Sequence, residues 1–376
     1  MDYELTSDQE FFQETTRKFL EAEAPVLTLR KLRDDPAGYH AGYWTQGAEL
    51  GWTSLLVAED DGGGSISGSG IADLALVAHE FGRHAAPGPL VATNVVAAAL
   101  SRWGSPAQKS DLLAPLLTGE AVASWALGEP PPHATLGAAT ATVTCAGDAV
   151  TVSGTKTPVE AGAQCSHFLV TARDGDDLVN VVVPADATGV TVTPLKSLDL
   201  TRRFAKVTFD GVSLPADSVL AGDGADQYEQ LLQLALAIQL NETVGAMEKG
   251  LEITTEWAFV RYSFGRPLAS YQEIKHRFAD MLMWLHASHA VTDEAVRAVG
   301  EGSTRAAELV SVAKAYVGDR STDLLQDCVQ IHGGIGVTWE HGLHLHMRRA
   351  RSLAIECGNM FAWEDLLARE LTGVAA

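Results

Sequence analysis

The pattern of hydrophobic and polar positions divides the chain into three blocks. In the first block apolar residues recur at helical spacing, as at Phe11, Phe12 and Phe19, and Ser7-Asp-Gln-Glu10 before them has the form of a capping box. The second block has short alternating runs rich in valine and threonine, separated by glycine, aspartate and proline, which is typical of β-strands. In the third block the helical spacing returns.

The third block predicts long helices. Leu231, Leu234 and Ile238 recur at helical intervals, and they indicate a helix from about residue 226 to residue 261. The stretch 270–273 has the form of a second capping box and predicts that the next helix begins there.

These blocks predict an α+β protein. We expect an N-terminal α-helical domain over residues 1–121, a middle antiparallel β domain over 122–222 and a C-terminal α-helical bundle over 223–376. The chain has 376 residues, of which 46% are hydrophobic, and this is enough to bury a sizeable core.

Charge and composition exclude several classes of function. The net charge of −21 argues against binding to nucleic acid or to an anionic membrane surface. The four cysteines show no metal-ligand spacing, which favours a reducing compartment. The start, Met-Asp-Tyr-Glu, lacks the features of a signal peptide, and no apolar run has the length of a membrane span. We therefore predict a cytoplasmic protein.

Two motifs point to a bound anion. One is Arg261-Tyr-Ser-Phe264-Gly265, and the other is Gln330-Ile-His-Gly333-Gly334. A guanidinium group suits a pyrophosphate because its planar donors meet phosphate oxygens in pairs, and glycines let backbone N–H groups approach the same anion. Taken singly, each motif also fits an ordinary helix end followed by a turn.

The two motifs, in this order and within a helix–β–helix arrangement, resemble the acyl-CoA dehydrogenases. The resemblance implies an FAD cofactor and a C-terminal four-helix bundle. It also implies that the Arg of R-x-x-F-G and the Gln and glycines of Q-x-x-G-G reach across a subunit interface to an FAD held mainly by the neighbouring chain. The cofactor-binding residues that it implies are Arg261, Ser263, Phe264, Leu268, Tyr271, Gln330, Gly333 and Gly334.

The sequence departs from this family at the catalytic base. The reaction needs a carboxylate that removes a proton α to the thioester, and the family's two positions for it correspond to Cys357 and Ala235 here. The nearby Glu242 is a candidate base, but it follows Ala235 by seven residues, roughly 10 Å along the helix axis, so helix packing is its favoured role. Glu356 adjoins Cys357, and in a regular segment its side chain would point elsewhere.

The expected flavin pocket departs from the family as well. Leu127-Gly-Glu-Pro130 begins like the family's flavin loop but continues into Pro131-Pro132. Pro158-Val-Glu160 stands where the family has a Trp-Ile-Thr stretch beside the flavin ring, so an indole is lost and a negative charge is gained. These changes indicate that the chain's own flavin pocket is damaged.

The retained and lost features together predict a dependent subunit. We expect an acyl-CoA dehydrogenase-type chain in an α2β2 assembly with a paralogous subunit, similar to the non-catalytic subunits of heteromeric actinobacterial enzymes, some of which act on CoA thioesters of steroid side chains. An electron-transfer flavoprotein is the implied electron acceptor. One alternative is a self-sufficient homomeric enzyme that uses Glu242, and another is a flavin-free scaffold. No metal site is predicted, because no acidic or cysteine ligands complete a set with the histidines from His276 to His346.

Overall fold

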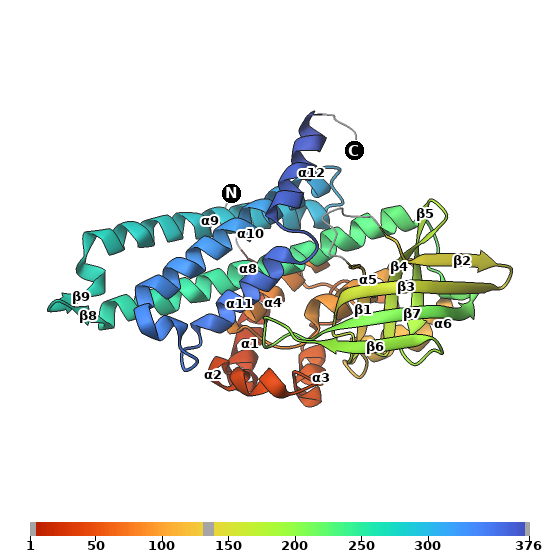
Figure 1. Cartoon of the computed structure of the whole chain (residues 1–376), viewed down its shortest axis with the longest axis horizontal. Helices are drawn as coiled ribbons and strands as arrows, with labels where there is room; N and C mark the ends of the chain where they lie inside the picture. The colour runs from red at the N-terminus through yellow and green to blue at the C-terminus, as the bar shows by residue number, and fades with distance from the viewer. Residues whose placement is uncertain (1–4, 131–138, 373–376) are drawn as a thin grey trace.

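A computed structural model describes residues 5–130 and 139–372, and its elements form three regions along the chain (Figure 1). The N-terminal region is helical. Its helices are α1 (Ser7–Glu23), α2 (Val26–Leu29), α3 (Ala41–Glu49), α4 (Gly70–His84), α5 (Leu90–Trp103), α6 (Pro106–Gln108) and α7 (Ala114–Leu117), with the short turns η1 (Arg30–Asp34), η2 (Glu59–Asp61) and η3 (Lys109–Leu113).

A capping box does begin α1, but it lies one residue earlier than predicted. Thr6 is the N-cap, and its hydroxyl accepts a hydrogen bond from the backbone N–H of Gln9 at 3.2 Å. The side chain of Gln9 in turn accepts from the backbone N–H of Thr6 at 3.1 Å. The predicted pair, Ser7 and Glu10, has the same spacing as the observed pair. The sequence pattern alone therefore does not distinguish the two registers.

The middle region is a β sheet. Its strands are β1 (Ala123–Ala126), β2 (Thr142–Ala146), β3 (Ala149–Glu160), β4 (His167–Asp174), β5 (Asp177–Pro184), β6 (Val190–Leu195) and β7 (Phe204–Pro215), followed by the turn η4 (Ala216–Ser218). The strand order is β1-β4-β2-β3-β7-β6, with β5 paired to β4. Most pairs are antiparallel, as predicted, but β4 runs parallel to β1 and to β2.

The C-terminal region is a bundle of long helices. It contains α8 (Gly224–Val260), the hairpin β8 (Tyr262–Ser263) and β9 (Arg266–Pro267), η5 (Leu268–Ser270), α9 (Gln272–Gly300), α10 (Ala306–His332), η6 (Gly333–Val337), α11 (Leu343–Ile355) and α12 (Met360–Thr372). Helices α8, α9, α10 and α11 lie side by side as the predicted four-helix bundle, and α12 packs on α10 (Figure 1).

The predicted helix over residues 226–261 is confirmed as α8, but the predicted cap of the next helix is wrong. Helix α9 has Tyr271 as its N-cap residue, with no hydrogen bond from a capping side chain. The Ser270 hydroxyl instead donates to the carbonyl oxygen of Pro267 at 2.7 Å. The tight turn before α9 therefore uses the serine that the pattern had assigned to the cap.

Helix α8 connects the two hydrophobic cores of the molecule. Leu231, Leu234 and Ile238 belong to the core shared with the N-terminal helices and the sheet. Leu236 and Leu240 belong to the core of the bundle. Because α8 is covered on both sides, it is apolar around most of its circumference where the two cores meet.

Helices α4 and α8 cross at very short distance through two glycines. A Cβ atom added at Gly245 would lie 2.0 Å from the carbonyl oxygen of His79, and one added at Gly82 would lie 1.9 Å from that of Glu242. No larger residue fits at either position without separating the helices. This crossing fixes the N-terminal domain against the bundle.

Within the described residues, none of the helices combines the length and apolar character needed to cross a lipid bilayer.

Candidate active site

A cavity of about 660 Å³ lies where the β sheet meets α5 and the ends of α8 and α11. This volume is in the range of small-molecule binding sites. Residues from all three regions line it, and those that matter for the chemistry are Trp125, Pro158, Glu160, Tyr228, Ala235, Gln239, Glu356 and Cys357.

Both positions at which a catalytic base was expected face this cavity. Ala235 on α8 and Cys357 after α11 are lining residues, and neither carries a carboxylate. Burial raises the pKa of the Cys357 thiol to about 11. The thiol is therefore protonated near neutral pH and does not serve as a general base.

Glu356 lines the cavity, contrary to the expectation that its side chain points elsewhere. The segment is not regular: α11 ends at Ile355, and Cys357 adopts a left-handed backbone conformation with φ of +56°. Glu356 accepts hydrogen bonds from Arg202 at 2.6 Å, Ser352 at 3.1 Å and Gln239 at 3.3 Å. Burial raises the pKa of Glu356, and the Arg202 guanidinium opposes that rise.

Arg202 joins two carboxylates of the cavity wall, Glu160 and Glu356. Its guanidinium donates to Glu160 at 2.8 Å as well as to Glu356. The negative charge of Glu160 is therefore compensated within the chain, which the sequence did not indicate. Pro158 lines the same wall, as expected from the missing Trp-Ile-Thr stretch.

An indole ring nevertheless lines the cavity from a different strand. Trp125 on β1 donates from its ring nitrogen to the hydroxyl of Thr171 at 2.8 Å and packs against Tyr228, with 6.0 Å between ring centroids. Nearby, Glu129 forms a buried ion pair of 2.6 Å with Lys156. Pro131 and Pro132, singled out in the sequence, lie outside the described residues.

The other candidate base, Glu242, is buried away from the described cavity lining. One of its oxygens accepts from Arg349 at 3.2 Å, and the other has no hydrogen-bond partner among the described residues. Arg349 also pairs with Asp199, so the three side chains form one buried network. Burial raises the pKa of Glu242 to about 7 despite the nearby arginine. The geometry agrees with the packing role favoured from the sequence.

The first cofactor motif lies at the opposite end of the bundle from the sheet, in the β8–β9 hairpin and the turn after it (Figure 1). The side chain of Phe264 is 97% exposed, and its φ is +48°. The Tyr271 hydroxyl donates to the carbonyl oxygen of Ser263 at 2.6 Å, and the backbone N–H of Leu268 donates to the carbonyl of Arg261 at 2.8 Å. These two bonds hold the hairpin in one conformation while leaving Arg261 exposed.

The second motif meets the first at this end of the bundle. The Arg261 guanidinium carbon lies 5.8 Å from the ring centroid of Trp257, and that ring stacks on His332 with 5.4 Å between centroids. His332 directly precedes Gly333, which begins η6. The structure thus brings together two segments that are far apart in the sequence.

The two glycines of the second motif stand in open space. A Cβ atom added at Gly333 or Gly334 would meet no atom within 4 Å among the described residues, apart from its own neighbours in the chain. Gly333 has φ of +63°, which favours glycine, but Gly334 is not in a left-handed conformation. Nothing within the described chain requires glycine at position 334, so the surface suits close approach by a group from outside.

The cavity is enclosed between a helical domain, a β sheet and a helical bundle, and both helical regions match known family models. Residues 6–120 match the acyl-CoA dehydrogenase N-terminal domain, and residues 222–371 match the acyl-CoA dehydrogenase C-terminal domain. The chain belongs to the acyl-CoA dehydrogenase family.

Individual relatives agree over nearly the full length. The chain is 25% identical over 357 residues to the acyl-CoA dehydrogenase IpdE2 of Mycolicibacterium smegmatis, covering 93% of this chain and 94% of that protein. Its structure matches a variant of the Tcur3481-Tcur3483 steroid ACAD with a TM-score of 0.88 at 25% identity, covering 97% of this chain and 98% of that one. It also shares the fold of a chain in the ChsE4-ChsE5 complex from Mycobacterium tuberculosis. The TM-score is 0.89 at 24% identity, and the match covers 100% of this chain and 100% of that one.

Proposed function

We propose that this chain is a subunit of an FAD-dependent acyl-CoA dehydrogenase and that it completes the FAD site of a paralogous partner in an α2β2 assembly. One observation carries the proposal. The cofactor motifs form an exposed surface at the far end of the bundle, whereas the chain's own cavity has no carboxylate at either expected base position.

The exposed surface fits the adenosine and pyrophosphate parts of a flavin. Arg261 offers a planar set of donors, and Gly333 and Gly334 leave backbone and space open to an approaching anion. We assign Ser263, Phe264, Leu268, Tyr271 and Gln330 as further contact residues for the same group. FAD, when bound, supplies the acceptor for the hydride that leaves the acyl chain.

Exposed apolar side chains near the hairpin support an interface at this end. Phe259, Val260, Tyr262 and Phe264 are all more than half exposed, and they follow one another over a short stretch of chain. Adjacent exposed aromatic and aliphatic groups of this kind are typical of surfaces that a partner covers. A paralogous subunit with the same fold can occupy the position that an identical chain takes in a homomer.

The finer parts of the proposal rest on the relatives. The Tcur3481-Tcur3483 protein is a steroid ACAD named for two components, which supports a second subunit and a steroid-type CoA thioester as substrate. The four cysteines are free, which agrees with the proposed cytoplasmic location. Electron-transfer flavoprotein is the proposed acceptor of the electrons.

A second candidate function is a self-sufficient homomeric dehydrogenase, and one observation favours it. Glu356 brings a carboxylate into the cavity beside Cys357, and burial raises its pKa. This candidate replaces the version based on Glu242, whose side chain is held by Arg349 in the buried network. The ion pair with Arg202 argues against Glu356 as the catalytic base, because it engages the carboxylate.

The experiment is an Arg261→Ala substitution in the complex of this chain with a paralogous acyl-CoA dehydrogenase subunit that carries a glutamate at a base position. We expect the FAD content of the purified complex to fall several-fold, because a charge-assisted pairing with phosphate is lost. Arg305→Ala is the matched control, since Arg305 is also exposed but pairs with Glu308 on α10. Unchanged FAD retention in the Arg261 variant would refute the assignment of this surface.

A further inference from the structure

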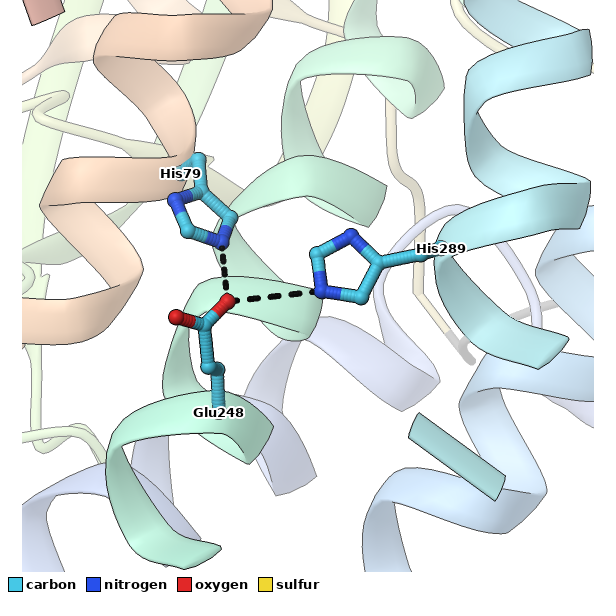
Figure 2. A group of neighbouring side chains, drawn as sticks. All are labelled: His79, Glu248 and His289. Carbon is cyan, nitrogen blue, oxygen red and sulfur yellow. Dashed lines mark hydrogen bonds and ion pairs between the residues drawn. The ribbon is translucent and has the colours of Figure 1, made fainter. Parts of the chain in front are cut away.

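Two histidines and a glutamate from three different helices meet where the N-terminal domain contacts the bundle. Figure 2 shows the imidazole rings of His79 on α4 and His289 on α9 pointing at the same carboxylate oxygen of Glu248 on α8. That oxygen, Oε2, lies 3.0 Å from Nε2 of His79 and 3.3 Å from Nε2 of His289. The three ligand atoms all lie within 4.8 Å of one another.

We propose that His79, Glu248 and His289 bind one divalent transition-metal ion of the Zn²⁺ type, which ties α4 to α8 and α9. Two imidazole nitrogens and one carboxylate oxygen are a donor set that suits Zn²⁺ and its neighbours in the first transition series. Mg²⁺ and Ca²⁺ prefer oxygen ligands and do not match two histidines. The fourth position on the ion is left for water.

The distances need little change to accept the ion. Zinc sits about 2.0–2.2 Å from nitrogen and oxygen ligands, which places neighbouring ligand atoms of a tetrahedron about 3.3 Å apart. Of the two separations from Oε2 of Glu248, the one to His289 is 3.3 Å and matches this value, and the one to His79 is slightly shorter at 3.0 Å. The side chain of His289 is 34% exposed and that of Glu248 is 36% exposed, so both can adjust and an ion can enter from solvent.

A carboxylate behind His79 can support its ring as a metal ligand. Its other ring nitrogen, Nδ1, is buried, has no hydrogen-bond partner in the described part of the chain, and lies 3.7 Å from a carboxylate oxygen of Glu80. When Nε2 binds a metal, the ring proton resides on Nδ1, where it faces Glu80. Carboxylates placed behind metal-bound histidines in this way orient the ring and increase its basicity.

The positive charge of Arg83 opposes cation binding at this site, but nearby carboxylates offset that charge. Its guanidinium donates to Oε1 of Glu248, which leaves Oε2 to the two histidines. The same guanidinium pairs with Glu252 at 2.6 Å and lies 3.8 Å from Glu80. Arg83 therefore orients the Glu248 carboxylate while its charge is shared among three acidic groups.

The close crossing of α4 and α8 holds the site in place. Gly245 lies against the carbonyl of His79, and Glu248 follows it by less than one helical turn. The spacing of the two helix backbones that carry these ligands is thus set by direct contact, and only the side chains need to adjust. Sequence spacing does not reveal this site, because its three ligands lie on three different helices.

The test is zinc binding to the untagged full chain after removal of metal with EDTA. We expect about one Zn²⁺ per chain by equilibrium dialysis and elemental analysis, and Co²⁺ in its place to give the visible absorption of a four-coordinate site. His289→Gln and Glu248→Gln are each expected to lower zinc affinity at least about ten-fold. The control is His286→Gln, because His286 is an exposed histidine on the same helix and is outside the cluster.

Two results would overturn the proposal. Wild-type protein without stoichiometric zinc would show that the cluster is a hydrogen-bonded ion-pair network only, and equal binding by the His289→Gln and His286→Gln variants would show adventitious surface binding. Thermal unfolding of the metal-free variants checks that each is folded. The result is independent of the proposed flavin function, because zinc binding is measured on this chain whatever its flavin content.

Discussion

At the scale of single residues, the two glutamates near the base positions have opposite outcomes. Sequence spacing places Glu242 well along the helix from Ala235, because that distance follows from helix geometry, and in the structure Glu242 is outside the described cavity lining. The same reasoning failed for Glu356, because the left-handed backbone at Cys357 is set by how the chain turns after α11. A local departure from regular geometry therefore decides which carboxylate enters the cavity.

Glu242 makes a prediction about the pH dependence of stability. In the folded chain its pKa is about 7, whereas its ordinary value is 4.5. The folded state therefore keeps the proton over a pH range in which the unfolded state releases it, so this group's contribution to stability is lost as pH rises from about 4.5 to 7. Glu242→Gln imitates the protonated form and should remove that loss.

The measurement is the free energy of unfolding in urea at pH 5 and pH 8. We expect the stability of Glu242→Gln relative to wild type to increase between these pH values by on the order of 1–3 kcal/mol. Glu256→Gln serves as the control, since Glu256 is an exposed glutamate on the same helix. If the relative stability of the Glu242 variant is the same at both pH values, the buried ionisation described here is incorrect.

At the scale of elements, hydrophobic periodicity was sufficient to predict the long helices and most strands, but it could not predict which elements contact one another. The spacing of Leu231, Leu234 and Ile238 predicted α8, because a helix that packs on a core must repeat its apolar positions. The pattern could not show that β4 pairs in parallel with β1, because pairing is a property of two segments. It also could not show which helix lies against Gly245.

The crossing of α4 and α8 can be tested with one methyl group. Gly245→Ala would place a Cβ atom 2.0 Å from the backbone oxygen of His79, and the two helices would have to separate. We expect a loss of about 3 kcal/mol or more in the free energy of unfolding, at the upper end of overpacking effects. Chemical denaturation monitored by circular dichroism measures the loss.

Gly318→Ala on α10 is the matched control for that substitution. A Cβ atom at Gly318 would meet only the carbonyl oxygen of Ala354, at 3.9 Å, which is ordinary contact distance. Because alanine is the better helix former, the control should be neutral or more stable by up to about 1 kcal/mol. Equal effects of the two substitutions would show that the close crossing does not hold the helices together.

At the scale of the whole molecule, the β8–β9 hairpin and the β sheet that lines the cavity lie at opposite ends of the bundle (Figure 1). The motifs around Arg261 and Gly333 were recognisable in the sequence because each is short and continuous. The contact between the two motifs, through Trp257 and His332, is visible only in the folded structure. The proposed cofactor-contacting surface is therefore distant from this chain's own cavity, and this separation is the reason to propose a partner.

The visible absorption spectrum of this chain purified alone, with the FAD content per chain, tests the proposed dependence on a partner most directly. The account predicts little or no bound FAD in the isolated chain, and a yellow complex when it is co-expressed with a paralogous subunit that carries the catalytic glutamate. Near-stoichiometric FAD in the isolated chain, reduced by an acyl-CoA in wild type but not in Glu356→Gln, would contradict it.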